Sequence, residues 1–258
     1  MTQAAFTPYH HHNYAKPKLR VLYPTGNVRR THTTTCRSNA GRKTETYAFK
    51  NPSDVKAMQE NLLYHSSTQR HYRLRNYLFF SLGLNLGFRA SDLCSLRWCN
   101  IYHPHSSDFN SADWNVVTEM KTGKTRQVVL NASAQNAITF YVLESGIIPE
   151  ALDPTSYVFA SRKGNSHINP DAMRKIIKTA AAQCNIPFNV GTHSMRKTFG
   201  YNLYKASGKD IGLVQSILNH SSEKTTLRYI GVDKEQTRDA YSLLQDNIWV
   251  PGKPLITN

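Results

Sequence analysis

Six side chains suited to phosphate chemistry are spread along the second two thirds of this chain. Cleaving a phosphodiester without a metal requires fixed cations for the charge on the nonbridging oxygens, and the planar fork of arginine suits that task. It also requires a hydroxyl nucleophile and a proton donor for the departing oxygen. The six candidates are Arg89, Lys121, His193, Arg196, His220 and Tyr229. We therefore expect one pocket assembled from these residues, with no cofactor and no metal.

The elements around these residues must bring them to one surface. His193 and Arg196 are three residues apart in a predicted helix that begins near Thr192, so they share a side of it. His220 lies nine residues before Tyr229, and Ser221 or Ser222 between them resembles a helix N-cap. Because helix entrances, turns and helix faces are where functional side chains converge, the spacing favours a shared site over six unrelated residues.

The rest of the pattern is mainly helical. Apolar residues at helical spacing predict helices over 54–63 (capped by Ser53 or Asp54), 72–84, 132–145, 170–184, 210–219 and 234–245, and a further helix opening at Arg89. Residues 114–120 and 125–130 read as two strands joined by a turn that contains Gly123, and 157–160 as a short strand. The expected fold class is mainly α with a small antiparallel β-sheet.

Four short motifs carry a resemblance to a known family. They are GFRASDL around Arg89, MKTGK around Lys121, HSMR from His193 to Arg196, and HSSEKTTLRY from His220 to Tyr229. Together they resemble the tyrosine recombinase, or phage integrase, family in residue type, order and local context. The resemblance implies the catalytic-domain fold of that family. It also implies a site-specific recombinase that cuts and rejoins DNA through a 3′-phosphotyrosine in integration, excision or resolution.

The resemblance also implies a role for each residue. Tyr229 would attack the phosphate, Arg89 and Arg196 would clamp its oxygens, and His193 and His220 would hydrogen-bond it or move protons. Lys121 would protonate the leaving oxygen.

Some assignments within the site stay open. Lys124, on the same turn, is the alternative acid to Lys121, Asp92 would orient the pocket, and Arg126 would at most touch a phosphate.

Composition sets the class of partner. The 258 residues include 32 Lys and Arg against 17 Asp and Glu, a formal net charge of +15, so double-stranded DNA is the expected partner and no membrane is expected. Neither an apolar run of membrane-spanning length nor a secretory signal is present, which predicts a cytoplasmic protein. The four cysteines form no CxxC pair and read as reduced thiols: Cys36, Cys94, Cys99 and Cys184.

The predicted organisation has two parts. Residues 1–47 contain no acid before Glu45 and several Arg and Lys, which predicts a basic arm without fixed structure, either following phosphates or serving as a plain leader. Residues 48–258 form the predicted catalytic domain, including the C-terminal helix and tail. Most family members carry a separate DNA-clamping domain before this one, so we expect the arm or an accessory DNA-binding protein to take that role. The resemblance also implies an oligomer, a tetramer on DNA.

Two other functions fit the same sequence. One is a relaxing activity like that of type IB topoisomerases, which would act on supercoiled DNA without sequence preference. The other is a DNA-binding protein of this fold without turnover, or simply a basic structural protein. A covalent protein–DNA adduct separates the catalytic functions from the binding functions.

Overall fold

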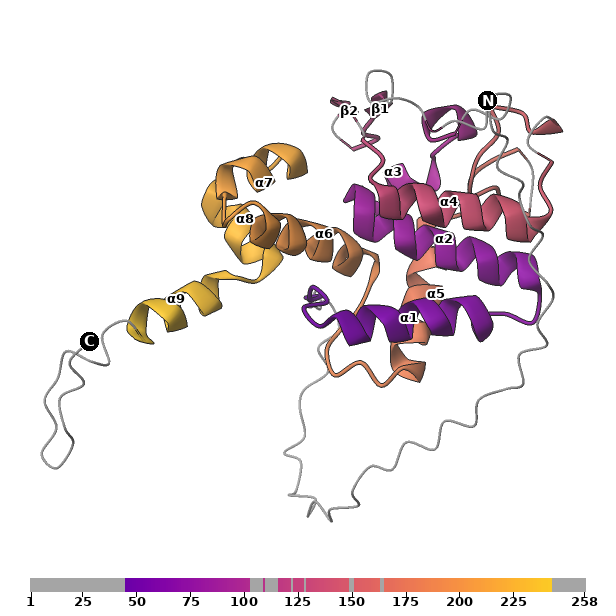
Figure 1. The fold of residues 1–258 in the computed structure, drawn as a ribbon. Coiled ribbons are helices and arrows are strands. Elements are labelled where there is room, and N and C mark those ends of the chain that lie inside the picture. The colour runs from indigo at the N-terminus through magenta and orange to yellow at the C-terminus, as the bar shows by residue number, and fades with distance from the viewer. Residues whose placement is uncertain are drawn as a thin grey trace, which may run out of the picture. The chain divides into compact units, whose positions relative to one another are not determined.

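The computed structural model describes residues 45–102, 109, 116–121, 123–127, 129–148, 151–162 and 165–242. All of them belong to one compact unit that begins at Thr44, and most of the predicted arm lies outside them. Figure 1 shows the order of the elements along the chain. They are α1 (Pro52–Tyr64), α2 (Arg70–Leu86), α3 (Ala90–Cys94), the 3-10 turn η1 (Trp98–Asn100), β1 (Val116–Thr118), β2 (Thr125–Gln127), α4 (Ala132–Ser145), α5 (Pro170–Gln183), α6 (Thr192–Ala206), α7 (Ile211–Leu218), α8 (Glu223–Ile230) and α9 (Asp233–Ser242).

Residues 45–47 belong with the compact unit and not with the arm. The Tyr47 amide donates to the Asn189 carbonyl at 3.1 Å, and the Lys197 ammonium donates to the Thr46 carbonyl at 2.7 Å. The predicted boundary at residue 47 is therefore too late, because these backbone contacts hold a segment whose polar composition gave no sign of it.

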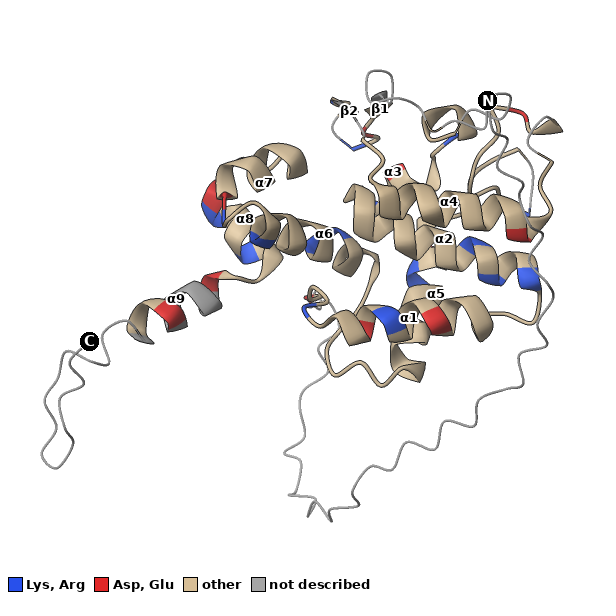
Figure 2. Cartoon of the chain, in the orientation of Figure 1, with Lys and Arg blue, Asp and Glu red and all other residues tan. Residues whose placement is uncertain are grey.

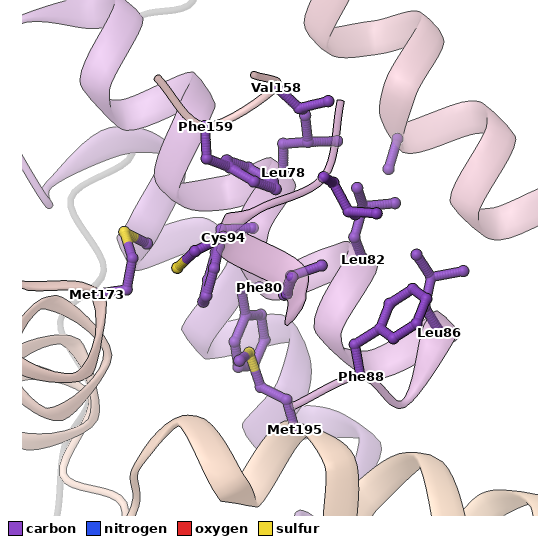
Figure 3. Packing of buried hydrophobic residues seen from close by; sticks show 14 of the residues in the cluster. Leu78, Phe80, Leu82, Leu86, Phe88, Cys94, Val158, Phe159, Met173 and Met195 are labelled. Carbon is purple, nitrogen blue, oxygen red and sulfur yellow. The ribbon is translucent and has the colours of Figure 1, made fainter. Parts of the chain in front are cut away.

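Helix α2 is the centre of the larger hydrophobic core. It packs against α1, α4 and α6, and it has buried residues on more than one of its sides, including Leu78, Phe79 and Leu82. Figure 3 shows Phe80 of α2 close to Met195 of α6. Gly83 makes this approach possible, since a Cβ there would lie 2.6 Å from the Met195 sulfur. The core thereby fixes the start of α6 against the second half of α2.

A second hydrophobic cluster holds α6, α7 and α8 together. Its buried members are Ala48, Tyr201, Tyr204, Val214, Leu218, Ile230 and Val232. A Cβ at Gly200 of α6 would lie 2.8 Å from Ile230 and 2.9 Å from Leu218, so only a glycine lets the three helices meet this closely. This cluster fixes the position of α8, the helix that carries Tyr229.

Helix ends follow local chemistry, with one difference from the prediction. Asn51, not Ser53 or Asp54, caps α1: its side chain accepts from the Ser53 amide at 3.1 Å and Pro52 takes the first helical position. Gly87 ends α2 in the left-handed conformation, with φ of 59°. The capping prediction failed because three residues within four positions could cap, and the proline selects the one before it.

Strand structure is sparse among the described residues. β1 and β2 pair antiparallel, with Val117 opposite Arg126, and the connecting turn carries Gly123 at φ of 65°. The described strand residues cover less than the predicted ranges. Segment 157–160 is not a strand, because a turn at Val158 and Phe159 leaves only isolated bridges at Tyr157 and Ala160.

The C-terminal helix α9 begins at Asp233, one residue earlier than predicted. Ala240 and Tyr241 on it are exposed, whereas Leu244, predicted to share their apolar side, lies outside the described residues. None of the described helices combines the length and apolar character needed to cross a membrane.

Candidate active site

Tyr229 lies near the end of α8, a helix of two turns. Ser222 caps this helix by accepting from the Thr225 amide at 3.2 Å, and Gly231 ends it at φ of 74°. Thr226 and Ile230 face inward and are buried, which leaves the Tyr229 side chain partly buried at the edge of the second cluster. The predicted cap and the delivery of the tyrosine by a short helix are both present.

The ring of Tyr229 contacts the side chains of His220 and Lys197. The His220 ring meets it edge to face, with centroids 4.8 Å apart, and the Lys197 ammonium lies 5.2 Å from its centroid. Burial raises the pKa of Tyr229, while the charges of Arg196 and Arg89 and a hydrogen bond from Arg196 act to lower it. Burial outweighs these opposing effects, so the phenol is protonated at neutral pH, and the two arginines offset part of the cost of ionising it.

Arg196 is 2% exposed and ties three segments together. One terminal nitrogen donates to the Gly87 carbonyl at 2.5 Å and the other to the Leu218 carbonyl at 2.6 Å. Burial lowers its pKa, although a guanidinium stays charged at any pH of interest. Because arginine has five N–H donors and the two carbonyls use one each, donors remain for Tyr229 and for a bound anion.

Arg89 occupies the N-cap of α3 directly after the loop that ends α2. A terminal nitrogen lies 2.5 Å from a Glu119 carboxylate oxygen and 4.0 Å from an Asp92 oxygen, and both acids are almost fully buried. Asp92 also accepts from the Met120 amide at 2.9 Å. These acids hold Arg89 and the start of the hairpin turn in fixed positions.

The two histidines have lowered pKa values for similar reasons. His193 reaches solvent at its edge, but the protein around it removes hydration and lowers its pKa, as do Arg196, Lys197, Arg89 and Lys121. Burial, then Arg196 and Arg89, lower the pKa of His220 to about 4. Its Nδ1 lies 3.2 Å from the Thr226 hydroxyl oxygen. Both imidazoles are therefore neutral at pH 7.

The hairpin brings its two lysines to different partners. Lys121 is exposed and close enough to His193 to depress the pKa of that histidine. Lys124 donates to the Asn219 side chain at 3.1 Å, at the end of α7. Lys124 thus docks the hairpin on the end of α7, whereas Lys121 lies near His193. The Arg126 side chain lies outside the described part of the protein.

All six predicted residues are brought together, and three further residues belong to the site. Glu119 pairs with Arg89, Thr226 touches His220, and Lys197 lies over Tyr229. The sequence did carry a signal for Glu119, because it is an acidic residue in a predicted strand directly before the hairpin turn. Nothing in the sequence marks Thr226 or Lys197. Within the described ranges, no group of three or more His, Cys, Asp or Glu side chains could hold a metal ion.

Comparisons with known proteins show which family this chain belongs to. Residues 54–236 match the model of the phage integrase family. The probable integrase/recombinase YoeC of Bacillus subtilis is 35% identical over 169 residues, which are 66% of this chain and 84% of that protein. A tyrosine recombinase of Pseudothermotoga lettingae is 29% identical over 196 residues, 76% of this chain and 60% of that one.

The same fold occurs in a solved structure. The XerH site-specific recombinase, crystallised with a palindromic difH substrate, matches with a TM-score of 0.58 at 22% identity. The match covers 82% of this chain and 56% of that one, so this chain spans little more than half of the solved protein. The expectation of a mainly helical fold of this catalytic-domain type is confirmed.

Proposed function

This chain belongs to the phage integrase family of DNA-cleaving and DNA-rejoining recombinases, and we propose that Tyr229 is its nucleophile in site-specific recombination. The observation that carries the proposal is the convergence on this one phenol of Arg196, Arg89 and His220, which come from different elements. The attack forms a bond from the Tyr229 oxygen to phosphorus and breaks the bond to the 5′ oxygen. A 3′-phosphotyrosine and a free 5′-hydroxyl result.

The cations have separate tasks in this step. Arg89 and Arg196 bind the nonbridging oxygens, whose charge grows in the transition state, and the buried carboxylates of Asp92 and Glu119 hold Arg89 in place. His193, exposed beside them, donates to the same phosphate. Lys121 supplies the proton for the 5′ oxygen, since it stands on the His193 side of the site while Lys124 is engaged with Asn219.

Binding of the DNA phosphate raises the pKa of His220, which allows this histidine to accept the proton of the Tyr229 phenol. Without a phosphate beside them, Arg196 and Arg89 add to burial in lowering its pKa to about 4. A phosphate between those arginines offsets their charge and raises the pKa of the imidazole again, because an anion nearby favours its protonated form. The proton of Tyr229 then passes toward His220, and its return accompanies the reverse attack by a 5′-hydroxyl that reseals the strand.

A nicked suicide duplex, from which the cleaved 5′ end diffuses away, tests this proposal. The protein should form a covalent adduct with a library of such duplexes, stable to denaturant and lost in Tyr229→Phe. The control is Tyr241→Phe, because Tyr241 is exposed on α9 and should form adduct as the unchanged protein does. An adduct that survives in Tyr229→Phe would refute the assignment of the nucleophile.

The proposed partners follow from the same function. Double-stranded DNA is the substrate, and assembly on it is oligomeric; in the solved relatives, a lambda integrase forms a dimer on a core site and a tetramer on a Holliday junction. We assign the catalytic domain to the unit that begins at Thr44 and extends to residue 258, and a DNA-following role to the basic residues before it. Deletion of residues 1–43 should weaken DNA binding and lower its salt dependence.

A further inference from the structure

A polar pocket of about 490 Å³ lies at the opposite end of α2 from Arg89. It is formed by the turn between α1 and α2, the first turns of α2, and the start of α5. The lining groups that the argument uses are Tyr72, Arg75, Asn76 and Arg162. Arg75 precedes Arg89 by 14 residues, most of them in α2, so at 1.5 Å per residue the pocket lies about 20 Å from Arg89.

Two arginines share one aromatic ring in this pocket. The guanidinium carbon of Arg75 lies 4.9 Å from the Tyr72 ring centroid, and that of Arg162 lies 5.3 Å from it. Each is within the range of a cation–π contact, so the ring fixes where both charges sit. Arg75 is held further by two donations to the Asn76 side chain, from Nε at 3.3 Å and Nη2 at 3.0 Å.

These two charges are not balanced by the protein around them. In the part of the chain that the structure describes, neither Arg75 nor Arg162 pairs with a carboxylate, while Glu144 and Asp171 are engaged by Arg70 and Arg174. Burial lowers the pKa of Arg75, and the charge of Arg162 lowers it further. Holding two like charges near one ring is unfavourable, and an anion bound between them would remove that cost. Figure 2 shows the basic residues on this half of α2.

The chemistry of the donors identifies the class of ligand. Nη1 of Arg75 makes none of that residue's described hydrogen bonds, and Arg162 is exposed with its planar fork available for two parallel bonds. Tetrahedral phosphate oxygens fit such a pair of forks, whereas an apolar ligand does not fit a pocket with two cations in it.

We propose that this pocket is a second phosphate-binding site, occupied by a backbone phosphate of the duplex that flanks the cleavage point. The proposal rests on the proposed function, because it is the duplex at Tyr229 that brings the phosphate. A separation of about 20 Å corresponds to about 6 base pairs at 3.4 Å each. The site thus binds the duplex at a phosphate away from the cleaved bond and helps to orient the duplex on the protein.

The test measures duplex binding as a function of salt, in a Tyr229→Phe background so that no strand is cut. Arg75→Gln and Arg162→Gln should each lower the slope of log K against log salt by about 1, the loss of one phosphate contact. The effect should appear on a duplex that extends about 15 base pairs to each side of the cleavage point and vanish on one that extends about 4. Arg162→Gln should fold normally because the Arg162 side chain is exposed, so its result does not depend on the stability of the Arg75→Gln variant.

Arg70→Gln is the matched control. It removes the same charge from the same helix, but Arg70 pairs with Glu144, so its slope should match that of the background on both duplexes. Equal slopes for all variants, or equal losses on both duplex lengths, would overturn the proposal. Inorganic phosphate, followed by NMR of the Arg162 side chain, distinguishes the sources. If free phosphate binds the pocket while the salt slopes of the arginine variants do not depend on duplex length, the pocket holds a free anion and the proposal is overturned. Failure of the catalytic proposal would appear instead in the adduct assay, where this pocket takes no part.

Discussion

Gly87→Ala should both destabilise the protein and disable its active site. Gly87 ends α2 at φ of 59°, two residues before Arg89, and its carbonyl accepts from Arg196 at 2.5 Å. A Cβ at this position would lie 2.2 Å from the Phe199 ring, far inside van der Waals contact. The substitution therefore forces a shift in the loop that positions Arg89, in Arg196, or in Phe199.

The expected cost has two parts. A left-handed conformation costs an alanine about 1–2 kcal/mol, and overpacking against a partly buried ring costs about 1–3 kcal/mol more. Gly146→Ala is the matched control, because Gly146 ends α4 at φ of 67° and a Cβ there would meet nothing within 4 Å. The control should lose only the first part, so the difference between the two variants isolates the contact with Phe199.

Equilibrium urea unfolding measures this difference. With a slope of about 3 kcal/mol per molar urea, Gly87→Ala should lower the midpoint by roughly 1 M and Gly146→Ala by about a third to a half of that. Adding Phe199→Leu should recover part of the loss in Gly87→Ala and none in Gly146→Ala. Adduct formation on the suicide duplex should fall in Gly87→Ala alone. Equal midpoints for the two glycine variants, with full activity, would refute the reasoning.

Three further predictions concern the residues around Tyr229. Thr226→Val should slow adduct formation about 5-fold and Thr226→Ser should retain most of it, because the serine keeps the hydroxyl that holds His220, a contact worth about 1 kcal/mol; equal rates for both would remove that role. His220 binds its proton near pH 4 when folded but near its ordinary pKa of 6.5 when unfolded, so stability is lost as pH falls from 6.5 toward 4. Urea unfolding of His220→Asn over this window should show a slope shallower by at most about 1 kcal/mol per pH unit, and identical slopes would contradict the lowered pKa. Asp92→Asn should reduce adduct formation at least 10-fold while a duplex still binds, as measured by fluorescence anisotropy, because the loss of its charge weakens the hold on Arg89 without removing a phosphate contact; unchanged cleavage would show that Glu119 suffices.

Local chemistry made much of the fold predictable. Helices such as α4 and α5 follow from apolar spacing and from capping residues, Asn131 and Asn169, that act within a few residues of themselves. The strand expected at 157–160 failed because its backbone bonds are set by distant partners, with Val158 donating to Leu96 and Ile168 donating to Phe159. Such pairings leave no trace in a local pattern.

The sequence by itself determined the chemistry available to this protein. The six predicted site residues are side chains of the right type, and all six lie in short motifs that can be read directly: a helix entrance, a hairpin tip, a helix face, and the two ends of a capped turn. The net charge of +15 likewise indicates a polyanionic partner whatever the fold, because it follows from composition alone.

Only the tertiary structure decided how those residues work together. In the folded protein Lys124 donates to Asn219, whereas Lys121 lies near His193. Arg89 pairs with the buried Glu119. Arg75 and Arg162 both contact the ring of Tyr72. Each of these joins segments far apart in the chain. The physical reason is that burial and Coulomb energy depend on distance in space, which packing around α2 and the α6–α8 cluster sets.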